Sequence, residues 1–259
     1  MSKYPLFDSH AHLDSLDYEE DRKEVLAQCE ELLAGLINPG CDRESSLKAM
    51  ELAKEYPFVY AAVGWHPEEI AKCRDEDIAI LEEWCKEPKV VALGEIGLDY
   101  FHDEGAPHEM QRQRFVEQLR LAKKVNLPVI IHDREAHGDT LELIKKEGQG
   151  VLGVMHCYSG SIDTAKEYLK LGWYFGFGGS STFKNAKKVK EVLAWMPSDR
   201  ILFETDSPYM TPVPFRGKRN NPCYTQLVAE NAAQLRGCDA EELMCISTEN
   251  IKKLFSRIK

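Results

Sequence analysis

The sequence predicts an α/β protein folded as a (β/α)8 TIM barrel, in which eight parallel strands alternate with helices. Three observations predict this fold: short apolar runs recur along the chain, amphipathic segments separate them, and polar residues suited to chemistry directly follow several of the runs. The 259 residues, 43% of them hydrophobic, match the usual length of such a barrel. We therefore expect residues 1–259 to form a single domain.

The apolar runs are the candidate strands, and each is short and nearly continuous. They are Leu6–Phe7, Gly35–Ile37, Val59–Val63, Val90–Leu93, Pro128–Ile131, Val151–Met155, Tyr174–Phe177 and Ile201–Phe203. Runs of this kind are typical of parallel strands covered on both faces. Their alternation with helical segments predicts right-handed crossover connections, and a closed barrel is the simplest architecture that satisfies both patterns.

The segments between the runs show the apolar spacing of helices. In a charged segment that starts near Glu19, the residues Val25, Leu26 and Cys29 recur on one face. Similar spacing predicts helices over Gln111–Val125, Asp139–Lys146, Ser161–Leu171 with Gly172 as its end, and the tail after Tyr224 with Asp239 or Ser247 as a cap. A doubly wound open sheet is the alternative, but no Gly-x-Gly-x-x-Gly turn follows the first run.

Charge and cysteine usage limit the classes of partner. The chain carries 43 acidic and 33 basic side chains, a formal net charge of −10, so a polyanionic substrate must be held locally, and Arg216–Arg219 is the densest basic run near a predicted site. The residues Met1–Pro5 hold no apolar leader and no long apolar span occurs, which favours a cytoplasmic protein without a membrane partner. The 8 scattered cysteines indicate reduced thiols, and no obligate protein partner is inferred.

A histidine pair directly follows the first run. Because side chains alternate along an extended chain, His10 and His12 project from the same face and can grip one metal ion. Taken alone, such a pair could also be a surface feature or a hydrogen-bonded couple. The ends of the other runs decide between these interpretations.

Further metal-binding side chains follow the fourth, fifth, sixth and eighth runs. They are Glu95, His132, His156, Glu204 and Asp206. In a barrel these positions converge on the C-terminal face, where active sites of this fold lie. Four histidines and two or three carboxylates supply enough ligands for two divalent ions, with Glu95 able to bridge them. The alternative, separate core histidines and capped carboxylates, would have to hold independently at five strand ends.

The motifs around these residues resemble the TatD family of metal-dependent deoxyribonucleases, which have an amidohydrolase-like barrel. The resemblance covers essentially the whole chain, and several motifs in the same order make it specific. The matching segments are Asp8–Asp14, Gly94–Tyr100, His132–Ala136, His156–Gly160, Glu204–Tyr209 and Arg216–Asn220. No metal position departs from the family pattern, although the family often has Asp where this chain has Glu135.

The resemblance implies how the ligands divide between ions. It implies that His10, His12 and Asp206 hold one ion, that His132 and His156 hold the other, and that Glu95 is shared. It also implies that Glu204 can join a third ion or a phosphate, with a buried ion-pair partner as the alternative role. Zn, Mg, Mn, Co, Fe and Ni are all compatible with this set.

The expected function is hydrolysis of phosphodiester bonds in DNA, from chain ends or in single strands. Two ions would activate a water, Asp206 would orient it and take its proton, and Asp99 and Ser207 would support metal-bound imidazoles, with a loop cap as the alternative for Asp99. The candidate substrate contacts are His66, Arg216, Arg219 and Tyr100, and Phe101 and Tyr158 are further stacking candidates. A structural histidine, a solvated basic run and packed aromatics are the alternatives.

Two other functions remain open at this point. The same ions could hydrolyse a carbonyl ester or amide, as in a D-aminoacyl-tRNA deacylase, although acyl chemistry has no need of the basic run. A non-catalytic scaffold could keep a structural metal, but this set supplies more ligands than one structural ion needs. A serine hydrolase is not supported, because the sequence has no Gly-x-Ser-x-Gly elbow.

Overall fold

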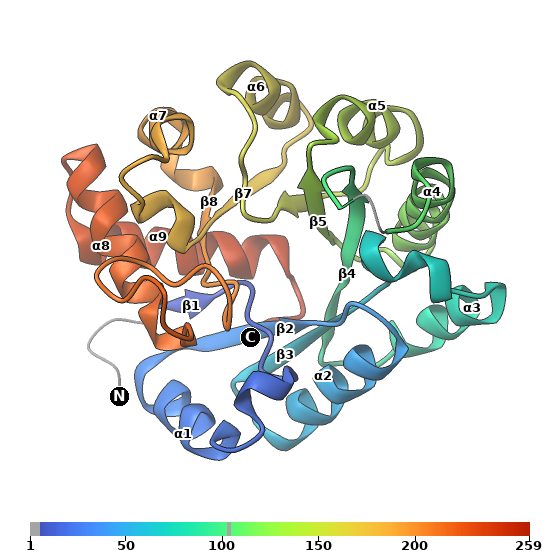
Figure 1. The fold of residues 1–259 in the computed structure, drawn as a ribbon, viewed down its shortest axis with the longest axis horizontal. Helices are drawn as coiled ribbons and strands as arrows, with labels where there is room; N and C mark the ends of the chain where they lie inside the picture. Colours follow the sequence, from blue (N-terminus) through green and yellow to red (C-terminus); the bar gives the residue numbers. More distant parts are fainter. Residues whose placement is uncertain (1–5, 103–104) are drawn as a thin grey trace.

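The parallel strands form a ring with the helices outside it (Figure 1). The computed structural model describes residues 6–102 and 105–259, so the N-terminal segment Met1–Pro5 lies outside the described residues. The sheet has eight strands in the order β1 to β8, and every neighbouring pair is parallel. The predicted (β/α)8 barrel is therefore confirmed.

Each predicted apolar run forms a strand. The strands are β1 (Phe7–Asp8), β2 (Gly35–Pro39), β3 (Val59–Val63), β4 (Val90–Asp99), β5 (Val129–Arg134), β6 (Gly153–Met155), β7 (Tyr174–Phe177) and β8 (Ile201–Phe203). The strands β4 and β5 continue beyond their apolar runs because they stay paired to each other as far as Asp99 and Arg134. That extension carries polar side chains of both strands to the mouth of the barrel.

The seam between the first and last strands closes through the residues that follow them. The amide of Ser9 donates to the Phe203 carbonyl at 3.0 Å, and the amide of Asp206 donates to the His10 carbonyl at 2.9 Å. A parallel bridge between Ala11 and Ser207 continues the pairing. His10 and Asp206, which lie far apart in sequence, are therefore fixed side by side by backbone hydrogen bonds.

The helices alternate with the strands. They are α1 (Arg22–Leu32), α2 (Arg43–Glu55), α3 (Asp75–Trp84), α4 (His108–Val125), α5 (His137–Glu147), α6 (Ile162–Lys170), α7 (Lys187–Trp195), α8 (Thr225–Arg236) and α9 (Ala240–Leu254), with short 3-10 turns η1 (Leu16–Tyr18), η2 (Pro67–Lys72), η3 (Gly179–Thr182), η4 (Ser198–Arg200) and η5 (Pro222–Tyr224). No helix in the described part of the chain is long and apolar enough to cross a membrane.

Local signals explain several helix ends. Ser161 caps α6 through the Thr164 amide, and Gly172 follows this helix with φ 81°. Asp239 caps α9, as predicted, by accepting the Glu242 amide at 2.8 Å. The alternative cap, Ser247, is wrong: it lies inside α9, and its hydroxyl accepts the Phe203 amide from β8.

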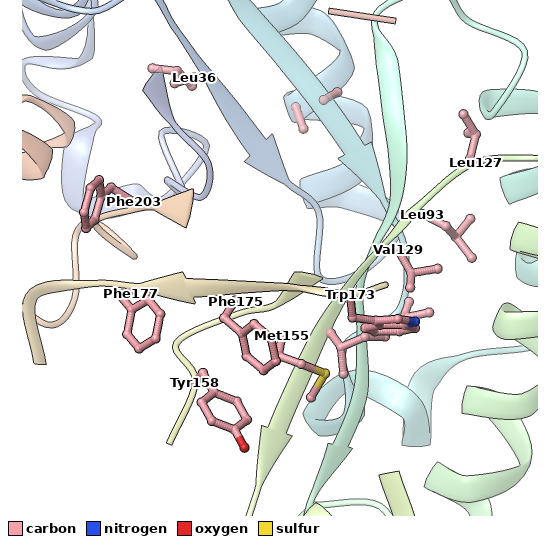
Figure 2. Packing of buried hydrophobic residues seen from close by; sticks show 14 of the residues in the cluster. Leu36, Leu93, Leu127, Val129, Met155, Tyr158, Trp173, Phe175, Phe177 and Phe203 are labelled. Carbon is pink, nitrogen blue, oxygen red and sulfur yellow. The ribbon is translucent and has the colours of Figure 1, made fainter. Parts of the chain in front are cut away.

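Two layers of apolar side chains hold the barrel together. Figure 2 shows part of the outer layer, in which Tyr158, Phe175 and Trp173 lie among the buried side chains of β5 to β8. The inner layer combines one or two residues from each strand with Ile251, Leu254 and Phe255 of the C-terminal segment. The chain end lies near the middle of the ring in Figure 1, so α9 fills the bottom of the barrel and leaves the opposite mouth for polar groups.

Candidate metal centre

The buried carboxylate of Glu95 on β4 lies between the histidines of the barrel mouth. Its Oε2 is 3.3 Å from His10 Nε2 and 3.8 Å from His12 Nε2. Its Oε1 faces the other side, 3.0 Å from His132 Nδ1 and 4.0 Å from His156 Nε2. Each oxygen of one carboxylate therefore meets a different pair of imidazoles, which is the geometry a bridging ligand needs.

Charge keeps Glu95 ionised in spite of its burial. Burial alone would raise its pKa, but the charges of His10 and His156 hold the pKa well below its usual range. On the other side of the centre, the Nε2 atoms of His10 and His12 lie only 3.1 Å apart and point at one another. Two imidazole nitrogens that face each other at this distance can both bind one cation placed beside them.

Asp99 at the end of β4 orients His132. Its Oδ2 accepts from His132 Nε2 at 2.8 Å, which directs Nδ1 of the ring toward Glu95. Its Oδ1 accepts the amides of Phe101 and His102, so Asp99 supports the imidazole and also caps the loop. Burial would lower the pKa of His132, but the hydrogen bonds to Asp99 and Glu95 raise it to about 9.

The pairing of β4 with β5 depends on one glycine. Gly97 lies opposite His132 in the register, with φ 147°, and a Cβ there would be 1.9 Å from the His132 carbonyl oxygen. No other residue allows this approach. This close approach fixes the position of His132 along β5 relative to Glu95 on β4. The glycine therefore contributes to the geometry of the centre.

Glu204 holds His156 from behind. Its Oε1 is 2.6 Å from the Cys157 amide and 3.1 Å from His156 Nδ1, so the Nε2 atom of this ring faces Glu95 and Asp206. Glu204 is fully buried, and a Cβ on Gly176 would meet its Oε2 at 2.4 Å. Ligand atoms of Glu204, His10 and His156 also lie within 4.8 Å of one another, so the geometry is compatible with a buried partner and with a metal ligand.

Asp206 is the carboxylate of the centre that solvent reaches. Its side chain is 17% exposed, and Oδ1 lies 3.5 Å from His156 Nε2 and 3.6 Å from His12 Nε2. Burial would raise its pKa, but the charge and hydrogen bond of His156 and the charges of His10 and His12 together lower it. Its φ of 56° is a left-handed conformation that Asp tolerates better than most residues.

The donor set fits divalent metal ions. Ligand atoms of His10, His12 and Glu95 lie within 4.8 Å of one another, as do those of His66, Glu95 and His132 and those of His156, Cys157 and Asp206. Imidazole nitrogens combined with carboxylate oxygens are the ligands that divalent transition metals take. The first two clusters share Glu95, and a further cluster of His10, His156 and Glu204 links the first to the third, so they form one continuous centre.

His66, which follows β3, also reaches this centre. Its Nε2 is 3.7 Å from Glu95 Oε1, while its Nδ1 accepts the Glu68 amide at 3.3 Å. Burial lowers its pKa to about 3, so the ring is neutral, and because Nδ1 accepts a hydrogen bond, Nε2 carries the proton. His66 is therefore built as a hydrogen-bond donor toward the centre.

The other candidate substrate contacts, Arg216, Arg219 and Tyr100, differ in how strongly neighbouring residues already bind their polar groups. Arg216 is exposed, with its guanidinium 4.2 Å above the Phe183 ring. Arg219 is bound to Asp21 and to the Asp17 carbonyl, so a phosphate would have to compete for it. The hydroxyl of Tyr100 is held by Asp139 and Arg112, 2.7 and 3.1 Å away, and its ring stacks on His108.

The aromatic candidates differ in their access to solvent. Phe101 is 54% exposed beside Arg134, whose guanidinium lies 4.0 Å above its ring. Tyr158 is buried against Phe175, so it belongs to the core, as its alternative interpretation held. Tyr209, which sequence reasoning did not select, is 55% exposed and lies near His12.

Sequence reasoning also missed Asp8. This fully buried carboxylate accepts the His10 amide at 3.1 Å and the Thr205 hydroxyl at 2.6 Å, so it joins the two chain segments that carry His10 and Asp206. Burial raises its pKa to about 7. A charged residue inside an otherwise apolar strand was the available signal.

A parallel barrel whose mouth gathers histidines and buried carboxylates is the architecture of a metal-dependent hydrolase. The profile of a family described as TatD related DNase matches residues 7–256. The chain belongs to this family.

Related proteins extend over nearly the whole chain. "Uncharacterized metal-dependent hydrolase YabD" of Bacillus subtilis (strain 168) is 48% identical over 252 residues, which cover 96% of this chain and 98% of the relative. "3'-5' ssDNA/RNA exonuclease TatD" of Cronobacter sakazakii is 33% identical over 257 residues, 96% of this chain and 97% of the relative. The solved structure of YJJV, a TatD homolog from Escherichia coli K12, superposes with a TM-score of 0.90 at 33% identity and covers 97% of this chain and 98% of its own.

Metal binding should release protons near neutral pH. His132 keeps its proton up to a pKa of about 9, and a ligand must lose it, so metal affinity should rise as the pH rises from 7 toward 9. In the metal-free protein the same proton stabilises the fold below the ordinary value of 6.5, and that contribution is lost as pH rises through about 9. Calorimetric metal titration at about pH 7, in buffers of different ionisation enthalpy, should detect proton release that Asp99→Asn reduces. Equal release by both proteins, or none, would contradict this role of Asp99.

Gly176→Ala should weaken metal binding without unfolding the barrel. The new methyl group would overlap the Glu204 carboxylate and displace the partner that orients His156, which typically costs about 10–100-fold in metal affinity. The matched control is Gly138→Ala, because a Cβ on Gly138 meets no atom within 4 Å. For both variants, metal content after dialysis measures metal binding and circular dichroism measures folding. Unchanged metal affinity in Gly176→Ala would show that Glu204 does not support His156.

Proposed function

We propose that residues 1–259 form one TatD-like hydrolase domain that cleaves phosphodiester bonds of DNA, from chain ends or in single strands. The observation that carries the proposal is Glu95, whose two oxygens face two separate pairs of imidazoles next to the accessible carboxylate of Asp206. The name of the Cronobacter relative, a 3'-5' ssDNA/RNA exonuclease, supports the choice of nucleic acid.

We propose two divalent ions in this centre. The first would be held by His10, His12 and Asp206, and the second by His132 and His156, with Glu95 between them. Zn, Mn, Co, Fe, Ni and Mg all suit nitrogen and oxygen donors of this kind. When bound, such ions polarise a phosphoryl oxygen and lower the pKa of a water to the neutral range. A third ion would be held by Glu204, whose ligand atom lies within 4.8 Å of those of His10 and His156.

The chain's own residues divide the remaining work. Asp206, ionised and partly exposed, orients a water and accepts its proton on a carboxylate oxygen. His66 donates from Nε2 to a non-bridging phosphate oxygen, which a neutral imidazole with its proton on that atom can do. Asp99 and Glu204 keep His132 and His156 turned toward the centre.

Basic and aromatic groups at the mouth would hold the strand. Arg216 is exposed and forms no ion pair among the described residues, so it is free to meet a phosphate. Arg219 would exchange Asp21 for the same ligand. Tyr100 and Phe101 follow β4, where Asp139 accepts from the Tyr100 hydroxyl and the exposed ring of Phe101 offers a face for stacking a base.

Asp206→Asn should abolish hydrolysis while keeping DNA binding. The amide cannot take a proton, so cleavage of end-labelled single-stranded DNA should fall by about 100-fold or more in the presence of added metal. Asp163→Asn, which changes an exposed carboxylate on α6, is the matched control and should cut like the wild type. Chelator should stop the wild-type reaction. Wild-type protein that leaves DNA intact with metal bound, but cleaves an aminoacyl ester, would replace the phosphodiesterase proposal with carbonyl chemistry.

A further inference from the structure

We infer that the loops after β7 and β8 form a binding surface for the sugar-phosphate backbone of a single-stranded nucleic acid, beyond the nucleotide that enters the metal centre. This inference rests on the proposed function and extends it to the length of strand that the protein grips. The surface, called the basic rim below, consists of Lys184, Lys187, Lys188, Lys190, Arg216 and Lys218.

The six cations of the basic rim lack acidic partners. None of its six side chains forms an ion pair with a carboxylate in residues 6–102 or 105–259. Many other cations of this acidic protein are paired, for example Arg114 with Asp75 at 2.7 Å and Lys124 with Glu82 at 2.7 Å. The basic rim therefore brings six unpaired cations together in the loops after β7 and β8 and in α7, where a polyanion would supply the missing partners.

The two loops form one continuous surface. The Arg216 guanidinium lies 4.2 Å above the ring of Phe183, the residue before Lys184, and the Val213 amide donates to the Thr182 hydroxyl at 3.0 Å. Arg216 is thereby held next to the lysines instead of extending freely into solvent. The charges of the two loops can act on the same strand.

Two lysines of the basic rim lie at the N-terminus of α7, where positive charge lowers the stability of the helix. Lys187 and Lys188 open the helix and no acidic residue lies in its first turn, whereas α3 begins with Asp75, Glu76 and Asp77. Cations at a helix N-terminus are repelled by the helix dipole. A placement that costs local stability, together with the missing ion pairs, indicates a role in binding an anionic partner.

The basic rim begins close to the metal centre. Gly178, at the end of β7, lies beside Cys157 and Glu204: a Cβ there would be 3.4 Å from Cys157 Sγ. Lys184 follows Gly178 by six residues in the sequence, so the Cα atoms of these two residues are at most about 22 Å apart. A strand with one end at the metal centre can reach the rim within a few nucleotides.

Exposed apolar side chains at the same mouth favour a single strand over a duplex. Tyr209, Met210 and Val213 in the loop after β8 are 55%, 40% and 46% exposed. An unpaired base can stack on the Tyr209 ring and contact the neighbouring apolar side chains, whereas the bases of a duplex are already stacked on one another. The partner that fits this surface is therefore a single strand, with a phosphate at each nucleotide and bases that are free to stack.

The test compares two double variants with the same change of net charge. Lys187→Gln/Lys188→Gln removes charge from the basic rim, and Lys123→Gln/Lys146→Gln removes exposed, unpaired lysines at the C-terminal ends of α4 and α5, at the end of the barrel away from the mouth. Metal-loaded proteins are assayed for kcat and KM on a single strand of about 16 nucleotides and on a dinucleotide, at several salt concentrations. Binding of the same labelled strand is measured in parallel by fluorescence anisotropy in the Asp206→Asn background.

The rim variant should raise KM and Kd for the long strand by roughly tenfold. It should also lower the salt slope of log K by about 1.4, because each phosphate that the protein no longer neutralises reduces the slope for a single strand by about 0.7. Its kcat and its KM for the dinucleotide should stay unchanged, as should every constant of the control variant. An unchanged KM and Kd for the long strand, an equal loss on the dinucleotide, or tighter binding of a duplex would overturn the inference.

The same assays separate this inference from the proposed function. Wild-type cleavage combined with an unaffected rim variant would remove the basic rim and leave the phosphodiesterase intact. Strand binding that depends on the rim lysines, without any cleavage by the metal-loaded wild type, would support the rim and refute the proposed reaction. Absence of both binding and cleavage would refute both.

Discussion

The buried carboxylate of Glu95 is the constraint on which the rest of the centre depends. An ionised carboxylate out of water costs several kcal/mol unless positive charge and hydrogen bonds compensate it, and here five imidazoles surround it. Those imidazoles must in turn be held with the correct nitrogen inward. Asp99 does this for His132 and Glu204 does it for His156. The ionised state of Glu95 therefore depends on two further buried carboxylates.

Two contacts between neighbouring strands bring the residues of the metal centre together. The β1 to β8 seam brings His10 beside Asp206, with Asp8 tying the two segments together, and the β4 to β5 register brings His132 beside Glu95. The opposite end is filled by α9 and its apolar side chains. The mouth thus holds buried carboxylates together with their imidazole partners, and the basic rim follows β7 and β8 at the same end of the barrel.

The sequence predicted what depends on local pattern, and missed what depends on contacts across the barrel. Eight apolar runs became eight strands, and the strand-end histidines and carboxylates converged because parallel strands all end at the same face. The pairing of Arg219 with Asp21, the position of Ser247 inside α9 and the support of His156 by Glu204 each join residues from distant segments. Side-chain proton positions, as in His66, also follow from neighbours that spacing does not reveal.

The most direct test of the account is the magnetic state of the protein loaded with Mn²⁺. Because the two oxygens of Glu95 face different imidazole pairs, two equivalents of metal should bind about 3.5–4 Å apart and give the electron paramagnetic resonance spectrum of an exchange-coupled pair. Glu95→Gln should convert this spectrum to that of isolated ions or lose the metal. A wild-type spectrum of one isolated Mn²⁺ at saturation would contradict a shared bridging carboxylate and the two-ion centre built on it.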